Sequence, residues 1–113
     1  MLEIQTRHLP PDIVVLEITG RIIGRECKQL ESAAGSLVHD KQEKKIIFDL
    51  SGVTHLDSTG VGTIAMAAGH VKQAGGELRL AGANKHIEHL LKVTSIDKLV
   101  SWKPTVDEAA SSF

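Results

Sequence analysis

Residues 45–50, which read Lys-Ile-Ile-Phe-Asp-Leu, constrain the fold more than any other segment of the chain. Their centre is continuously apolar, whereas a strand with one solvated face alternates between apolar and polar residues. A continuous run of this kind is typical of a parallel strand that is covered on both faces. Because parallel neighbours need long crossover connections, usually helices, we expect this strand to lie inside an α/β sheet.

Other segments predict the remaining strands. An extended segment over residues 3–8 precedes Pro10-Pro11, and the β-branched run of residues 13–19 stops at Gly20, so a hairpin opens the chain. Residues 77–81 alternate like a further strand, and residues 98–102 fit a short last one.

Apolar residues at steps of three and four predict the helices between these strands. Gly75-Gly76 ends the helix predicted over residues 59–74, and Asn84 and Thr105 are suitable N-caps for two shorter helices. The predicted order is β-β-α-β-α-β-α-β-α, an α/β fold with a mixed, mostly parallel sheet and helices packed on it. The apolar positions of the two longer helices are Cys27, Leu30, Ala34, Leu37 and Val38, then Val61, Ile64, Ala65, Ala68 and Val71.

Composition excludes several classes of protein. A chain of 113 residues is the size of one domain, which we expect to span residues 1–113, and a net charge of -1 gives no basic field for nucleic acid. The lone Cys27 excludes an internal disulfide and a multi-cysteine metal site, and it fits a reducing compartment. We find no signal-peptide pattern and no apolar run near the roughly 20 residues of a membrane span, so we expect a cytoplasmic protein without membrane insertion.

The candidate site is the segment Asp57-Ser58-Thr59-Gly60, at the start of the second long helix. We expect it at the carboxyl side of the sheet, where open α/β sheets commonly place their functional sites. From spacing alone, a plain helix cap at Ser58 or Asp57 explains the segment as well.

The helix that follows this segment carries no Asp, Glu, Lys or Arg from Ser58 to Val71. A surface helix normally carries charged residues on its solvent face. An uncharged face beside a helix N-terminus suits a protein interface, although another element of the fold or a second copy of the chain is the alternative cover. The residues predicted to lie opposite the sheet are Thr59, Thr63, Met66, Ala67 and His70.

Catalytic and metal-binding sites fit the sequence less well. Residues 60–65 match a loose dinucleotide-binding fingerprint, but the predicted strand ends at Leu50, well before the glycines, and Glu77 lies at the wrong end of the next strand. Ser58 lacks the Gly-x-Ser-x-Gly setting of a hydrolase nucleophile. His86 and His89 lack a third ligand of clear spacing. We therefore expect no catalytic residue, metal or cofactor.

Residues 48–62, which read Phe-Asp-Leu-Ser-Gly-Val-Thr-His-Leu-Asp-Ser-Thr-Gly-Val-Gly, resemble the signature of STAS domains, especially of anti-sigma factor antagonists. The similarity continues through residues 75–80 and 93–99, and the element order agrees. In that family the serine after the aspartate is phosphorylated by a partner kinase that is often also the anti-sigma factor. The resemblance implies phosphorylation of Ser58, with Thr59 as the less favoured position.

The same resemblance implies a non-enzymatic regulator of transcription that works by partner switching. It would bind an anti-sigma factor and serine kinase of histidine-kinase-like ATPase fold, as a monomer or weak homodimer, and leave it on phosphorylation. STAS domains also act in transporters and as scaffolds of signalling assemblies, so a STAS subunit of an ABC-type phospholipid transport system is the alternative. The expected partner-binding residues are His55, Asp57, Ser58, Thr59, Gly60, Thr63, Met66 and His70.

One position departs from the family pattern. Members commonly carry Gly-x-Leu/Ile-Asp after the second strand, whereas this chain reads Gly20-Arg21-Ile22-Ile23. The acid near the phosphorylated serine is therefore absent at Ile23, and Glu26 lies three residues further along the chain. The departure bears on the standard kinase partner and on ordinary phosphorylation of Ser58.

Overall fold

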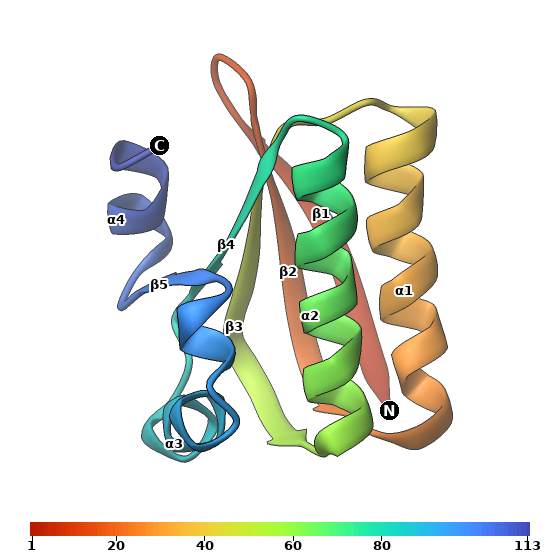
Figure 1. Ribbon diagram of the computed structural model, residues 1–113, viewed down its shortest axis with the longest axis vertical. Helices are drawn as coiled ribbons and strands as arrows, with labels where there is room; N and C mark the ends of the chain where they lie inside the picture. Colours follow the sequence, from red (N-terminus) through yellow and green to blue (C-terminus); the bar gives the residue numbers. More distant parts are fainter.

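The computed structural model describes residues 1–113 and contains one five-stranded sheet with the order β1-β2-β3-β4-β5. The first two strands pair antiparallel and all other neighbours are parallel, which confirms the predicted mixed α/β sheet and element order (Figure 1). The strands are β1 (Leu2–Leu9), β2 (Ile13–Ile22), β3 (Lys45–Leu56), β4 (Glu77–Ala81) and β5 (Ser101–Lys103).

Helices cover both faces of this sheet. Two long helices, α1 and α2, lie side by side on one face, whereas the short C-terminal helix α4 packs on the other (Figure 1). A π-helical turn over Ser36–Asp40 continues α1, and short 3-10 turns occupy Gly24–Glu26 and Ile96–Lys98. The helices are α1 (Cys27–Gly35), α2 (Ser58–Gln73), α3 (Lys85–Val93) and α4 (Val106–Ser111).

The continuous apolar centre of β3 is explained by these two layers. Ile46 and Phe48 belong to the main core beneath α1 and α2, while Ile47 packs with Ala109 of α4 on the opposite face. All three β3 side chains have 0% exposure, so the strand is covered on both sides as predicted.

The predicted caps of the shorter helices are confirmed. Asn84 Oδ1 accepts a hydrogen bond from the backbone N–H of Ile87 at 2.9 Å and starts α3. Thr105 Oγ1 accepts from the N–H of Glu108 at 3.1 Å and starts α4. Trp102 lies on the edge strand β5 and packs against the main core.

The predicted ends of two strands were wrong. β2 continues past Gly20, and its partner β3 continues past Leu50 as far as Leu56. The register shifts at Gly20, whose φ of 109° only glycine adopts readily, so this residue forms an irregularity within the strand and does not end it. The long loop predicted between β3 and Gly60 is therefore absent. β3 ends at Leu56 and α2 begins at Ser58, so one residue separates them. Glu77 does lie at the start of β4, which still disfavours a dinucleotide site.

The last strand also begins later than predicted, because Ile96–Lys98 form a 3-10 turn before Ser101. None of the helices combines the length and the apolar character that crossing a membrane would require.

Candidate functional site

Asp57 joins the end of β3 to the start of α2. Its Oδ1 accepts a hydrogen bond from the N–H of Gly60 at 2.7 Å, which makes Asp57 the N-cap of the helix. Its Oδ2 accepts from the N–H of Gly24 at 3.1 Å, in the loop that follows β2. A single carboxylate therefore fixes both the first turn of α2 and the neighbouring loop, and of the two possible caps the structure uses Asp57.

Ser58 is the first residue of α2, and its side chain is exposed. Because Asp57 supplies the cap, the fold does not need the Ser58 hydroxyl to start the helix. The N–H groups of Ser58 and Thr59 have no acceptor within the helix, and the helix dipole places partial positive charge there. This turn of the helix can therefore carry an anionic group on Ser58.

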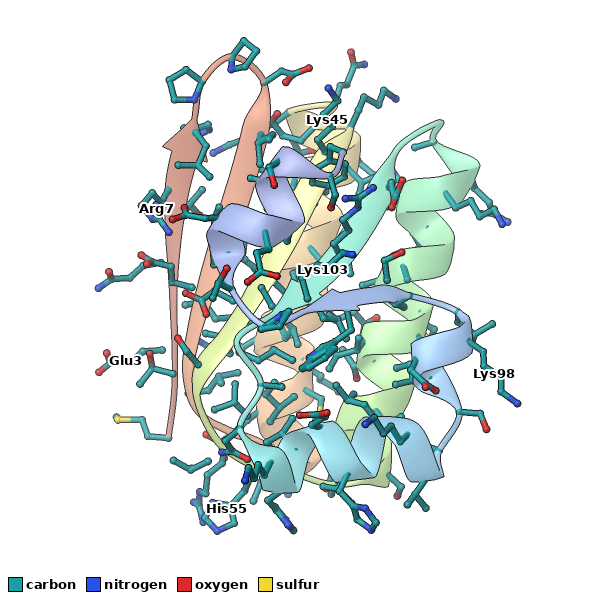
Figure 2. The ribbon with its side chains drawn as sticks, turned by 90° about the vertical axis from the view of Figure 1, so that its left-hand side faces the viewer. Glu3, Arg7, Lys45, His55, Lys98 and Lys103 are labelled. Carbon is teal, nitrogen blue, oxygen red and sulfur yellow. The ribbon has the colours of Figure 1, made fainter.

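His55 lies near Ser58 in sequence, at the end of β3, and is exposed. Its Nδ1 is 3.0 Å from Thr54 Oγ1. Figure 2 shows the labelled imidazole pointing away from the body of the molecule. It is accessible to a partner from solvent.

Gly60 is buried beneath the exposed turn. A Cβ at this position would meet the Ile22 carbonyl oxygen and would lie 2.6 Å from Leu56 Cδ1. Gly60 therefore allows α2 to approach the ends of β2 and β3 closely, and it is buried instead of exposed on the surface of the helix.

The predicted uncharged face of α2 is rotated from its expected position. Thr63 and Ala67 were expected to be exposed. Their relative solvent-accessible surface is only 8% and 6%, because α1 packs beside α2. Cover by another element of the fold was the alternative given above, and for Thr63 and Ala67 that alternative holds. Val61, Ala65 and Ala68 are half-buried, and Ile64 is fully buried as predicted.

The exposed residues of α2 before Lys72 form a narrow surface, here named the α2 stripe. Met66 is its one large apolar side chain, with 50% exposure. Beside it runs a shallow groove between α1 and α2, bordered by Glu31, Met66 and His70. Gly62 and Gly69 were missed, because their lack of a side chain hides them from a hydrophobic pattern. The α2 stripe comprises Ser58, Thr59, Gly62, Met66, Gly69 and His70.

Ile23, where the family acid is absent, is half-buried in the loop beside Asp57. Glu26 does not replace that acid, because its carboxylate pairs with the amino group of Met1 at 3.1 Å and with Arg21 at 4.0 Å. The carboxylate next to Ser58 is that of Asp57.

Cys27 has the buried apolar role that its helical position predicted, with 3% exposure. Burial raises the pKa of its thiol. The thiol is thus protonated near neutral pH. His86 and His89 are both exposed on α3, and the structure contains no cluster of three or more His, Cys, Asp or Glu side chains suited to a metal.

Comparison with known proteins identifies the family. The family model described as STAS domain matches residues 3–109. The chain belongs to the STAS domain family. A STAS relative from Thermotoga neapolitana, named as a candidate anti-sigma factor antagonist homologue, is 33% identical over 70 residues. That match covers 62% of this chain and 62% of the relative, which is less than two thirds of the relative's length.

Solved structures share the same STAS fold. An anti-sigma factor antagonist from Mycobacterium paratuberculosis has a TM-score of 0.89 at 22% identity, covering 99% of this chain and 93% of that one. The Bacillus cell fate determinant SpoIIAA in its phosphorylated form has a TM-score of 0.74 at 15% identity, covering 97% of this chain and 98% of that one. At these identities the similarity establishes the fold.

We expect Asp57→Ala to lower the free energy of unfolding of this STAS domain by about 1–3 kcal/mol. The substitution removes the cap on Gly60 and leaves the N–H of Gly24 without its acceptor. Asp57→Asn is the matched control, because one amide oxygen can keep one of the two bonds, so its stability should be intermediate. Urea denaturation followed by circular dichroism measures both. An alanine variant as stable as wild type would show that these bonds do not fix the turn.

Proposed function

We propose that this STAS domain is a cytoplasmic anti-sigma factor antagonist that binds an anti-sigma factor with serine kinase activity and is released by phosphorylation of Ser58. The observation that carries the proposal is the exposed hydroxyl of Ser58 on a helix that Asp57 already caps. The relatives named as candidate anti-sigma factor antagonists support this class of function.

The proposed binding surface is the α2 stripe together with His55. It contains no Asp, Glu, Lys or Arg, so a partner can cover it without desolvating a full charge. Met66 offers a flexible apolar contact at its centre. Gly60 and Thr63 shape this surface from beneath, because both are buried against neighbouring elements.

Phosphorylation would act on this surface through charge. A phosphate on Ser58 adds about -1.5 to -2 charges at one end of an uncharged stripe, beside the Asp57 carboxylate. The first turn of α2 can accept the group without unfolding. The partner would have to desolvate or oppose that charge, so its affinity falls while the STAS fold persists.

The proposed kinase step has no acid at position 23 to use, because that residue is Ile23. Asp57 is the carboxylate adjacent to Ser58, and it is held by the N–H groups of Gly24 and Gly60. We infer that the partner kinase recognises the serine through the turn that Asp57 fixes.

Met66→Lys tests the binding surface. We expect affinity for the partner to fall by about tenfold or more, because the change places a charge at the centre of an apolar contact. Thermal melting should stay near that of wild type, since Met66 is half exposed. Val93→Lys is the matched control, because Val93 is 66% exposed on α3, outside the proposed surface.

The experiment starts from affinity copurification of the C-terminally tagged chain from its native cells, followed by titration of the captured protein with both variants. A histidine-kinase-like ATPase whose binding is lost in Met66→Lys alone supports the proposal. Capture of a transport ATPase would contradict it and favour a transport subunit. Equal binding by the two variants would exclude the α2 stripe as the interface.

A further inference from the structure

β1 is an edge strand whose outer side is free. It is 8 residues long, whereas the opposite edge strand β5 has only 3. Proteins commonly protect a long edge with proline or lysine, but Leu2–Leu9 contain neither. Figure 2 shows no helix, strand or loop beyond the outer side of β1, where the labelled Glu3 and Arg7 lie.

The hydrogen-bond pattern shows which backbone groups face outward. The N–H of Arg21 donates to the carbonyl of Met1, and Leu2 lies opposite Gly20 in the same register. Because hydrogen-bonded pairs alternate along an antiparallel ladder, the odd-numbered residues of β1 bond to β2 and the even-numbered ones point away. Gln29 Nε2 donates to the outward carbonyl of Leu2 at 3.1 Å, which agrees with this assignment. The outward backbone groups without such a side-chain partner are those of Ile4, Thr6 and His8.

The sequence of β1 is complementary to itself in the antiparallel direction. We propose that a second copy of this chain adds its β1 to this edge with Gln5 opposite Gln5, so that the two sheets become continuous. In this register Glu3 of each copy faces Arg7 of the other. Ile4 faces Thr6, and both have outward backbone groups, so these two residues can exchange hydrogen bonds across the dimer.

The charges favour this register over its neighbours. Glu3 and Arg7 fall at pairs that share no backbone hydrogen bond, where facing side chains are closest. Glu3 has no ion pair within its own chain, and Arg7 Nε lies 3.4 Å from Glu17 Oε2 across the ladder. In the dimer Arg7 would lie between Glu17 and the Glu3 of the second copy. A shift by two residues would remove both Glu3–Arg7 pairs.

The pairing is isologous, so it closes at two copies and leaves neither β1 edge exposed. It does not use α2, so each copy would still present Ser58 and Met66 to the proposed partner. The proposed dimer is therefore independent of the proposed function, and an experiment that excludes one does not exclude the other.

The test is sedimentation equilibrium of the full chain and of two charge variants, Glu3→Arg and Arg7→Glu. Each variant alone places like charges opposite each other twice, so we expect its dimer dissociation constant to rise by about tenfold or more. An equimolar mixture of the two restores opposite charges at both positions, because Arg at position 3 then faces Glu at position 7. The heterodimer should form with nearly wild-type affinity.

Thr6→Pro provides a second readout. Its N–H points away from β2, so proline removes a donor that only the dimer uses, while melting should change little. A wild-type chain that remains monomeric up to about 1 mM would overturn the proposal. A dimer that persists in all variants would also overturn it, because a different surface would then hold the copies together. Loss of the dimer in each single variant with recovery on mixing supports it.

Discussion

Ser58→Asp should bind the proposed anti-sigma partner about 100-fold more weakly than wild type, because a fixed charge inside a close contact leaves a buried ion without a counterpart. Its thermal melting should remain close to that of wild type. The side chain is exposed at the first turn of α2, where an acidic residue interacts favourably with the helix dipole. Isothermal titration with the purified partner measures the affinity, and circular dichroism measures the melting.

Two variants separate charge from loss of the hydroxyl. Ser58→Ala should keep wild-type affinity, since Asp57 and not Ser58 caps the helix, but it should resist the kinase. Thr59→Ala should keep the phosphosite. Mass spectrometry after incubation with the partner kinase and ATP locates the phosphate. Phosphate on Thr59 alone, or undiminished affinity of Ser58→Asp, would contradict the proposed switch.

The central strand and the caps could be predicted from the sequence because local chemistry determines them. An apolar run such as Ile46-Ile47-Phe48 has few stable environments other than a strand covered on both faces. Asn84 and Thr105 are each the single residue suited to be the N-cap at the start of its helix, so the capping role was unambiguous. Asp57 and Ser58 are adjacent and both can cap, so only the geometry of the β3–α2 junction distinguishes them.

The errors arose where a second element decides the outcome. The sequence predicts that β2 ends at Gly20. In the structure β2 continues to pair with β3 beyond the irregularity, as far as Ile22. Thr63 reads as exposed when α2 is placed against the sheet alone, and its burial depends on how closely α1 approaches. The pairing of β2 with β3 and the packing of α1 on α2 leave no pattern in the local sequence, because the elements in contact are separated along the chain. The sequence therefore placed Thr63 and Ala67 on the exposed face of α2, whereas the structure buries both beside α1.

Gly60→Ala should lower the free energy of unfolding by roughly 2–3 kcal/mol, because it overpacks a rigid junction. The new methyl group would overlap the Ile22 carbonyl and lie 2.6 Å from Leu56 Cδ1 and 3.1 Å from Ile22 Cγ2. A backbone carbonyl cannot rotate away as a flexible side chain can. Since the same carbonyl accepts from the N–H of Asp57 at 3.4 Å, a displaced α2 would also strain the cap.

Gly62→Ala is the matched control two residues further along α2, where an added Cβ meets no atom within 4 Å. Alanine there should raise the free energy of unfolding by up to about 1 kcal/mol, because it restricts the unfolded chain and favours the helix. For a domain of this size the two variants should differ in Tm by roughly 10 °C or more in a thermal melt. If Gly60→Ala melts at or above Gly62→Ala, α2 is free to move away from Ile22. The close contact would then not be what fixes the position of Ser58.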